Sequence, residues 1–313
     1  MKIFTEDLLR HFIVSGCVLS ILMFIVALPA TSFGHGVAGK RFFPTTFAVD
    51  DPFISDEFSA LYNYIKMNDE TGGPPFNISS LSVGYVKRIT PKFGIKLEES
   101  YQTLRTNNGY AASGFGNLGV NLKYQFFMDP DHETILSAGV SDEIGRTGSG
   151  KVRSKTFSVI SPAIYFGKGF GDLPAAVSYL RPLAITGVIG ENFPAQKTTE
   201  GVENPTSLTW SFSVQYSLMY LQSEKDVGLG KPFNRMIAII EFPHETCLNT
   251  DCKHQTSATI NPGVVWIGQY TELGLAAEFP VNSRSGAGTG AFILFRLFID
   301  DIFPETIGRP IFP

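Results

Sequence analysis

The sequence has few cysteines, few histidines and, beyond its N-terminus, no long uncharged apolar run. It contains three cysteines and five histidines in 313 residues, and its formal net charge of −4 is spread without a basic stripe. The shortage of apolar runs excludes a bundle of membrane-spanning helices, because each helix needs about 20 apolar residues. The lack of a basic stripe argues against nucleic acid as a partner. Glycine (31) and phenylalanine (27) are abundant, which suits a β-protein with many tight turns.

The N-terminus has the order of features found in secretory signal peptides. Two basic residues, Lys2 and Arg10, precede an apolar stretch, 12–28, which Pro29 and several small residues follow. This order predicts a signal peptide over residues 1–34, cut within the small residues after Pro29. The apolar stretch is nearly long enough to span a membrane as an uncut helix, but the proline and the small residues favour cleavage.

Residues 208–220 alternate strictly between two kinds of side chain. Small polar residues separate large apolar ones, which are Leu208, Trp210, Phe212, Val214, Tyr216, Leu218 and Tyr220. A period of two predicts a β-strand with one apolar and one polar face. The run is longer than the usual soluble strand of about 5–6 residues. It matches the roughly 9–11 residues that a tilted strand needs to cross a bilayer.

Further strand patterns follow one another as successive hairpins. They cover residues 78–88, 93–101, 116–127, 134–144, 156–167, 175–188, 235–242, 256–269, 272–281 and 291–299. Single-chain bacterial barrels have an even number of strands. We therefore predict an all-β fold, a transmembrane antiparallel up-and-down β-barrel of about 12 strands, over residues 76–300, with a C-terminal tail over 301–313. Barrels of 10 or 14 strands and a secreted β-sandwich are the alternatives.

The segment 35–75 differs from the rest of the chain. It includes a possible helix from Asp56 to Met67, in which apolar residues recur at helical spacing. We expect a non-barrel segment that plugs the lumen or covers it from the periplasm. An exposed N-terminal arm is the alternative.

The polar faces of the predicted strands supply candidates for a lumen lining. A charge on the lipid face at mid-bilayer costs about 2–4 kcal/mol, so charged residues in these strands are expected to face inward. The candidates are Lys96, Glu98, Lys123, Ser211, Ser213, Gln215, Ser217, Glu272, Glu278 and Arg296, and Arg181 and Glu241 carry charge on the same predicted faces. They either line a pore or pair with one another and hold the barrel shut.

The cysteines and histidines of the mature chain indicate little chemistry. Cys247 and Cys252 lie five positions apart, which in an oxidising compartment predicts a small loop disulfide. His244 and His254 flank them, but the spacing differs from common metal motifs. The histidines fall at turns or strand ends, and no nucleophile motif accompanies them. We expect no enzymatic activity, no metal and no cofactor.

Residues Gly114–Phe126 (GFGNLGVNLKYQF) carry a resemblance to a known family. A Gly-x-Gly-Asn turn leads into an alternating strand with Lys-Tyr. This pattern resembles the outer-membrane proteins grouped with the phenol-degradation MetA-pathway family and related transporters. The resemblance implies an outer-membrane channel for small organic compounds, apolar ones included.

Together these patterns predict a protein exported by its signal peptide to the outer membrane of a Gram-negative cell. Its expected partners are the lipid bilayer and a small-molecule solute. The expected function is passive diffusion through the lumen, with the N-terminal segment as a gate. A non-conducting barrel that serves as a structural or loop-mediated binding protein is the alternative, and the oligomeric state is left open.

Overall fold

The computed structural model describes residues 36–67, 75–106, 109–249 and 254–312. Within these residues, no helix is both long and apolar enough to cross a membrane.

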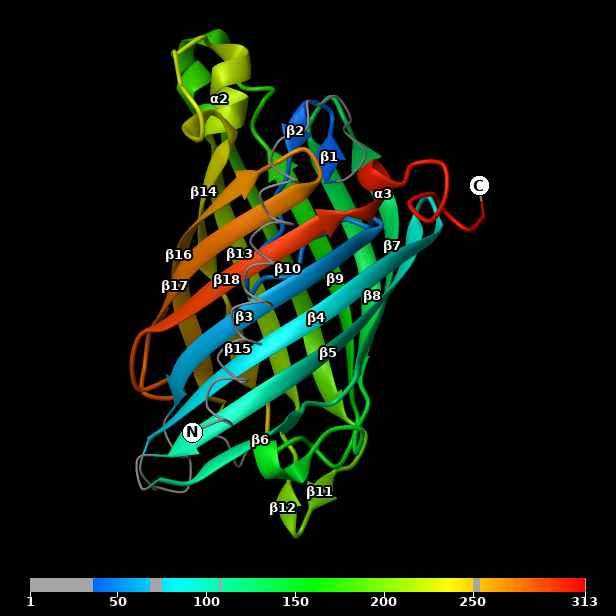
Figure 1. Cartoon of the computed structure of the whole chain (residues 1–313), viewed down its shortest axis with the longest axis vertical. Helices are drawn as coiled ribbons and strands as arrows, with labels where there is room; N and C mark the ends of the chain where they lie inside the picture. Colours follow the sequence, from blue (N-terminus) through cyan, green and yellow to red (C-terminus); the bar gives the residue numbers. More distant parts are fainter. Residues whose placement is uncertain (1–35, 68–74, 107–108, 250–253, 313) are drawn as a thin grey trace, which may run out of the picture.

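Twelve antiparallel strands close into a barrel, which confirms the predicted all-β class and strand number (Figure 1). The strands are β3 (Glu57–Met67), β4 (Phe76–Thr90), β5 (Phe93–Thr106), β7 (Gly119–Asp129), β8 (Thr134–Glu143), β9 (Val159–Gly169), β10 (Leu183–Pro194), β13 (Ser207–Ser217), β14 (Met236–Phe242) continued by β15 (His244–Cys247), β16 (Thr256–Ile267), β17 (Thr271–Pro280) and β18 (Gly290–Phe298). Pairing of β18 with β3 closes the ring, so the sheet has no free edge.

Short elements decorate the two ends of the barrel (Figure 1). At one end, the α3 end, lie β1 (Val37–Ala38), β2 (Arg41–Phe42), α2 (Leu218–Glu224) and α3 (Ile299–Ile302). The opposite end, the β12 end, carries β6 (Ala111–Phe115), β11 (Thr198–Thr199) and β12 (Val202–Glu203). Three 3₁₀ turns, η1 (Gly150–Val152), η2 (Ala175–Leu180) and η3 (Phe233–Arg235), complete the elements.

The helix expected at Asp56–Met67 is wrong, because these residues form strand β3. Each residue of β3 is paired with β4, and most are also paired with β18. The spacing of apolar residues there fits a helix, but backbone pairing with strands on both sides overrides so weak a local preference. The barrel therefore begins at Glu57 rather than at residue 76, and β3 is the twelfth strand.

Other expected strands also differ in their bounds, and two of the differences have a clear local cause. The strand expected over 175–188 starts only at Leu183, after η2. The strand expected over 208–220 ends at Ser217, where the serine hydroxyl accepts a hydrogen bond from the backbone N–H of Tyr220 (3.0 Å) and caps α2. A capping serine stops a strand that the apolar alternation would continue.

The two faces of the barrel wall carry different side chains. Large apolar residues are exposed on the outer face, among them Leu81, Leu97, Tyr124, Ile164, Ile189, Leu275 and Ile293. Such a surface matches a lipid-facing band. The inner face is divided. On β14 and β16–β18 it packs an apolar cluster that includes Ile237, Ile239, Val265 and Leu294, whereas the inner side of β4, β5, β7 and β8 is polar.

Candidate functional site

The segment that precedes the first barrel strand lies inside the lumen. We call residues 36–56 the inner segment. It starts at the α3 end, reaches its deepest point near Asp50, and returns to Asp56 at the end of β4. Residues 41–57 are buried or half-buried apart from Ala48 and Asp50. The inner segment is therefore a loop suspended from one end of the barrel.

A wall carboxylate holds the descending part of the inner segment. Glu241, on β14, accepts hydrogen bonds from the backbone N–H groups of Phe47 (2.7 Å) and Ala48 (2.9 Å). Its side chain is fully buried. Because two consecutive backbone N–H groups donate to this one side chain, Glu241 fixes the position of the loop relative to the wall.

The ring of Phe47 fits a recess made by two wall glycines. A Cβ atom on Gly274 would lie 2.7 Å from the ring, and one on Gly263 would lie 3.0 Å from it. The ring also contacts Phe292, with the two centroids 6.0 Å apart. Because only glycine leaves this space, the wall is shaped to receive the inner segment.

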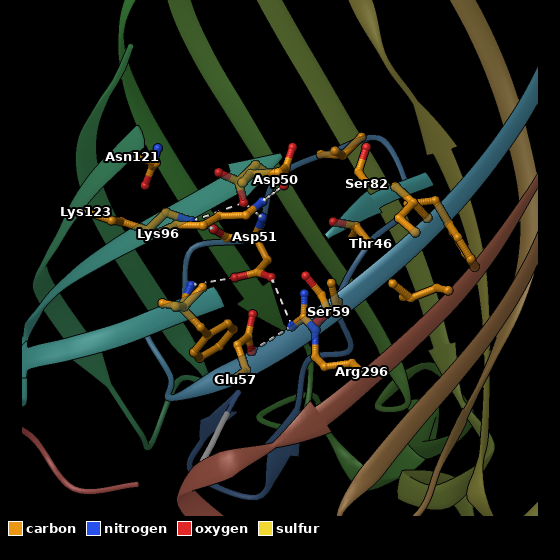
Figure 2. Close-up of a pocket in the computed structure, with 18 of the residues that line it drawn as sticks. Thr46, Asp50, Asp51, Glu57, Ser59, Ser82, Lys96, Asn121, Lys123 and Arg296 are labelled. Atoms are coloured by element: carbon orange, nitrogen blue, oxygen red, sulfur yellow. Dashed lines mark hydrogen bonds and ion pairs between the residues drawn. The ribbon is translucent and has the colours of Figure 1, made fainter. Parts of the chain in front are cut away.

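Ion pairs hold the deepest and returning parts (Figure 2). The Lys123 ammonium on β7 lies 3.2 Å from the Asp50 carboxylate and donates to the Asp51 carbonyl (2.6 Å). Arg296 on β18 donates to Glu57 (2.9 Å) and lies 3.8 Å from the Asp51 carboxylate. These contacts join the loop to two separate strands of the wall, β7 and β18.

A buried arginine seals the α3 end. Arg41 is 1% exposed, and its guanidinium donates to Glu133 (3.1 Å) and to the Pro182 carbonyl (2.8 Å). It also lies 4.0 Å from the centre of the Tyr220 ring. Since these partners belong to three different connections, Arg41 ties the N-terminal hairpin across the mouth of the barrel.

A second set of charges fastens the point where the inner segment becomes β3. Asp56 is fully buried and accepts from Lys87 (2.6 Å) and Arg88 (2.6 Å). The same two cations donate to backbone carbonyls of Ile307 and Gly308 in the C-terminal tail. The tail thus folds back over the wall next to the base of the inner segment.

Two cavities occupy the polar half of the lumen. The inner cavity, about 200 Å³, lies between the inner segment and the wall, and the outer cavity, about 430 Å³, extends toward the β12 end. Five residues line both, namely Asp50, Ser82, Lys96, Glu98 and Asn121. We call this shared region the junction. A path for a solute therefore runs from the β12 end to the inner segment.

An ion pair on the wall stands at the junction. Lys96 and Glu98, two residues apart on β5, form a short ion pair. Room for it comes from Gly84 on the neighbouring strand, where a Cβ would lie 3.1 Å from Lys96 Cε and 3.5 Å from Glu98 Oε2. A larger residue at position 84 would push these side chains into the path.

The predicted lumen residues separate into two groups. The structure brings Lys96, Glu98, Lys123 and Arg296 together around the inner cavity. The β13 residues are buried but bond to the wall itself, with Gln215 donating to Ser213 (3.0 Å) and to Thr186 (3.2 Å). The Ser211 hydroxyl accepts a hydrogen bond from the His244 backbone N–H (3.1 Å) and donates one to the His244 carbonyl (3.5 Å). Ser217 caps α2.

Two predicted carboxylates have structural partners. Glu272 is fully buried and accepts from the Thr45 N–H of the inner segment (3.4 Å). Glu278 accepts from Asn63 on β3 (3.1 Å). Arg181 lies in the connection before β10 and donates to Glu224 (2.9 Å), so its expected place on a strand face is wrong.

The expected cysteine pair lies partly outside the described residues. Cys247 ends β15, whereas Cys252 is not described, so the disulfide stays a prediction. In the described part of the chain, no group of three or more His, Cys, Asp or Glu side chains is arranged to hold a metal ion.

Sequence reasoning missed the acidic residues of the inner segment and of the first position of β3. Asp50, Asp51 and Glu57 lie outside every predicted strand and show no periodicity. The run Asp50-Asp51-Pro52 has the composition of a solvent-exposed turn. A signal for β3 was available, since Phe58, Ala60, Tyr62 and Tyr64 alternate with Ser59, Leu61 and Asn63.

Comparison with solved structures supports the fold. The chain is similar to the COG4313 outer membrane channel from Pseudomonas putida F1, with a TM-score of 0.57, 10% identity, and coverage of 82% of this chain and 99% of the other. A lower similarity links it to the NanC porin (TM-score 0.48, 9% identity, coverage 77% and 98%). No family model and no curated protein matches the sequence. The resemblance to the MetA-pathway family therefore stays a prediction.

Proposed function

We propose that this chain is an outer-membrane channel for small solutes, closed at its α3 end by the inner segment. The observation that carries the proposal is the pair of cavities that lead from the β12 end and stop at the inner segment. The first barrel strand, β3, begins at the α3 end, and the last one, β18, ends there. Bacterial barrels have short turns on the periplasmic side, and the two- to four-residue turns after β4, β7 and β16 also lie at the α3 end. We therefore place that end in the periplasm.

The solute is polar rather than apolar. Three cations (Lys96, Lys123 and Arg296) and serine and asparagine side chains line the path. An apolar solute would strip water from these charges without replacing it, which costs several kcal/mol for each fully desolvated charge. The apolar cluster on β14 and β16–β18 is already covered by Phe42 and Phe47 of the inner segment, so it offers no alternative path while the inner segment is in place.

Export to the outer membrane rests on two features. The predicted signal peptide over residues 1–34 directs secretion, and the apolar outer face suits a bilayer. Edman sequencing of the protein purified from outer membranes checks both, because a mature N-terminus between residues 30 and 35 is expected.

Deletion of residues 36–53 tests the gate. This deletion keeps Asp56 and Glu57, which anchor β3 to β4 and β18. In planar bilayers we expect large, steady conductance steps from the deletion variant and rare, short openings from the intact chain. Equal and silent recordings from both proteins, each shown to be inserted by protease protection, would refute the channel.

A cysteine pair tests whether the inner segment must move. A Cβ atom at Gly94 would lie 3.8 Å from Ile54 Cβ, which is the mean separation in disulfides. In the I54C/G94C variant, oxidation should make openings rarer, and reductant should restore them. The unmodified chain, with its native cysteines, is the control for effects of reductant alone.

A structural anchor is the second candidate. It is favoured by the number of lumen charges that already have partners, such as Arg296 with Glu57 and Lys96 with Glu98. If it is correct, the deletion variant stays silent and loses stability, since the inner segment then serves only as core.

A further inference from the structure

Accessible charges of both signs lie at the junction and beside it. Lys96 and Glu98 form one ion pair at the junction, and Asp50 forms another with Lys123 of the inner cavity. The side chains of Asp50 and Glu98 are each 43% exposed, and that of Lys96 is 33% exposed. A solute in the cavities can therefore reach charged atoms of both signs.

The Lys123–Asp50 pair joins the wall to the inner segment at the inner cavity, which both residues line (Figure 2). In the proposed passage, a solute that enters the inner cavity from the junction separates this pair. A simple cation could replace Lys123 at Asp50, but it would leave the Lys123 ammonium, which is 10% exposed, without that carboxylate. A simple anion at Lys123 would likewise separate Asp50 from its ion-pair partner. Separating the pair without replacement costs the free energy of this partly exposed ion pair.

A solute that carries both charges avoids this cost. Its ammonium group can take the place of Lys123 at Asp50, while its carboxylate takes the place of Asp50 at Lys123. We propose that the junction selects small zwitterionic solutes of the amino-acid type, which open the path by exchanging partners with this ion pair. The proposal rests on the proposed channel function and names its substrate class.

The size of the inner cavity suits such a solute. A cavity of about 150 Å³ holds benzene, which has six heavy atoms, and the inner cavity measures about 200 Å³. A small amino acid, with its two charges separated by two bonds, fits this space. Ser82 and Asn121, which line both cavities, add neutral hydrogen-bonding groups beside the charges.

Vesicle-swelling rates with four solutes of six heavy atoms each test the proposal. Alanine is the zwitterion, lactamide its neutral isomer, alaninamide the cation and lactate the anion. Partly exposed ion pairs are worth up to about 1 kcal/mol each, so two new pairs at about 0.7 kcal/mol each correspond to roughly a tenfold preference. We expect the intact chain to pass alanine about tenfold faster than lactamide, and both ions more slowly than alanine.

Two double variants separate selectivity from gating. D50N/K123M removes the pair that joins the wall to the inner segment, so alanine and lactamide should enter at equal rates. E143Q/K155M removes another ion pair, between Glu143 and Lys155 (2.9 Å), where Glu143 lines only the outer cavity. This matched control should keep the preference for alanine. The ratio of the two rates reports selectivity even if a variant changes how often the channel opens.

Each outcome has a defined meaning. Equal rates for alanine and lactamide through the intact chain would overturn the zwitterion proposal and leave the channel standing. Loss of the preference in both double variants would also overturn it, because the effect would then not belong to the junction. No swelling with any solute, in the intact chain and in the E241A variant described below, would overturn the channel and the selectivity together.

Discussion

Replacement of Glu241 by alanine should open the channel without removing any of the inner segment. The carboxylate accepts from two consecutive backbone N–H groups, of Phe47 and Ala48, at 2.7 and 2.9 Å. A typical intramolecular hydrogen bond contributes about 0.5–1.5 kcal/mol, so this pair contributes roughly 1–3 kcal/mol. A net loss of about 2 kcal/mol changes the closed-to-open ratio by about thirtyfold.

Single-channel recording at fixed voltage measures this change directly. The open probability of E241A should exceed that of the intact chain by about thirtyfold, up to the limit set by a fully open channel. The conductance of each opening should stay the same, because Glu241 does not line either cavity. A changed step size with unchanged open probability would refute the assignment of Glu241 as an anchor of the inner segment.

Glu278 provides the matched control. It is also a buried, inward-facing carboxylate, but its partner is Asn63 on the wall strand β3 (3.1 Å). Glu278→Ala should therefore leave the open probability close to that of the intact chain. If both variants open equally, loss of any buried charge loosens the barrel, and the specific role of Glu241 is wrong.

Three other predictions concern the wall and its turns. Urea unfolding of the barrel in vesicles measures the effect of Leu275→Lys, at the middle of the outer face of β17, which should destabilise the inserted barrel by about 2–4 kcal/mol. The control Val202→Lys, in the exposed β12 hairpin, should have little effect in that assay. Asp56→Asn should destabilise the barrel by about 3 kcal/mol in that assay, because its two cationic partners lose a buried carboxylate, and an unchanged midpoint would contradict this. At the α3 end, the hydrogen bond to Asp172 (3.0 Å) raises the pKa of exposed His132. This contact therefore stabilises the folded protein at a pH below the pKa that His132 has in the unfolded chain, and the stabilisation is lost as the pH rises through the pKa of His132 in the folded protein. Asp172→Asn should lower the His132 titration midpoint measured by NMR, and identical midpoints would refute the coupling.

The alternation of side chains was sufficient to predict the barrel. An apolar residue at every second position over segments such as 208–217 and 118–126 can satisfy lipid on one side and a lumen on the other only as a β-strand. Backbone groups in a bilayer must all be bonded, so such strands must close into a ring. The inward position of Lys96, Lys123 and Arg296 follows from the same alternation.

The sequence could not reveal which inward residues form hydrogen bonds with one another. Ser213 and Gln215 share a polar face with no feature that distinguishes them from a pore lining, yet they bond to Thr186 on the next strand. That contact depends on the register between β10 and β13, which the alternation alone does not specify.

The class of fold, the period of two and the polarity of each strand face follow from the sequence alone, because they depend on neighbours along one strand. That Glu57–Met67 closes the ring and that the inner segment lies in the lumen follows only from the three-dimensional contacts. Local spacing at β3 favoured a helix, and Asp50-Asp51-Pro52 resembled a surface turn. Both were overridden by partners distant in sequence, namely two flanking strands for β3 and Lys123 for Asp50. Such contacts form only when the barrel closes, so no local pattern in the sequence indicates them.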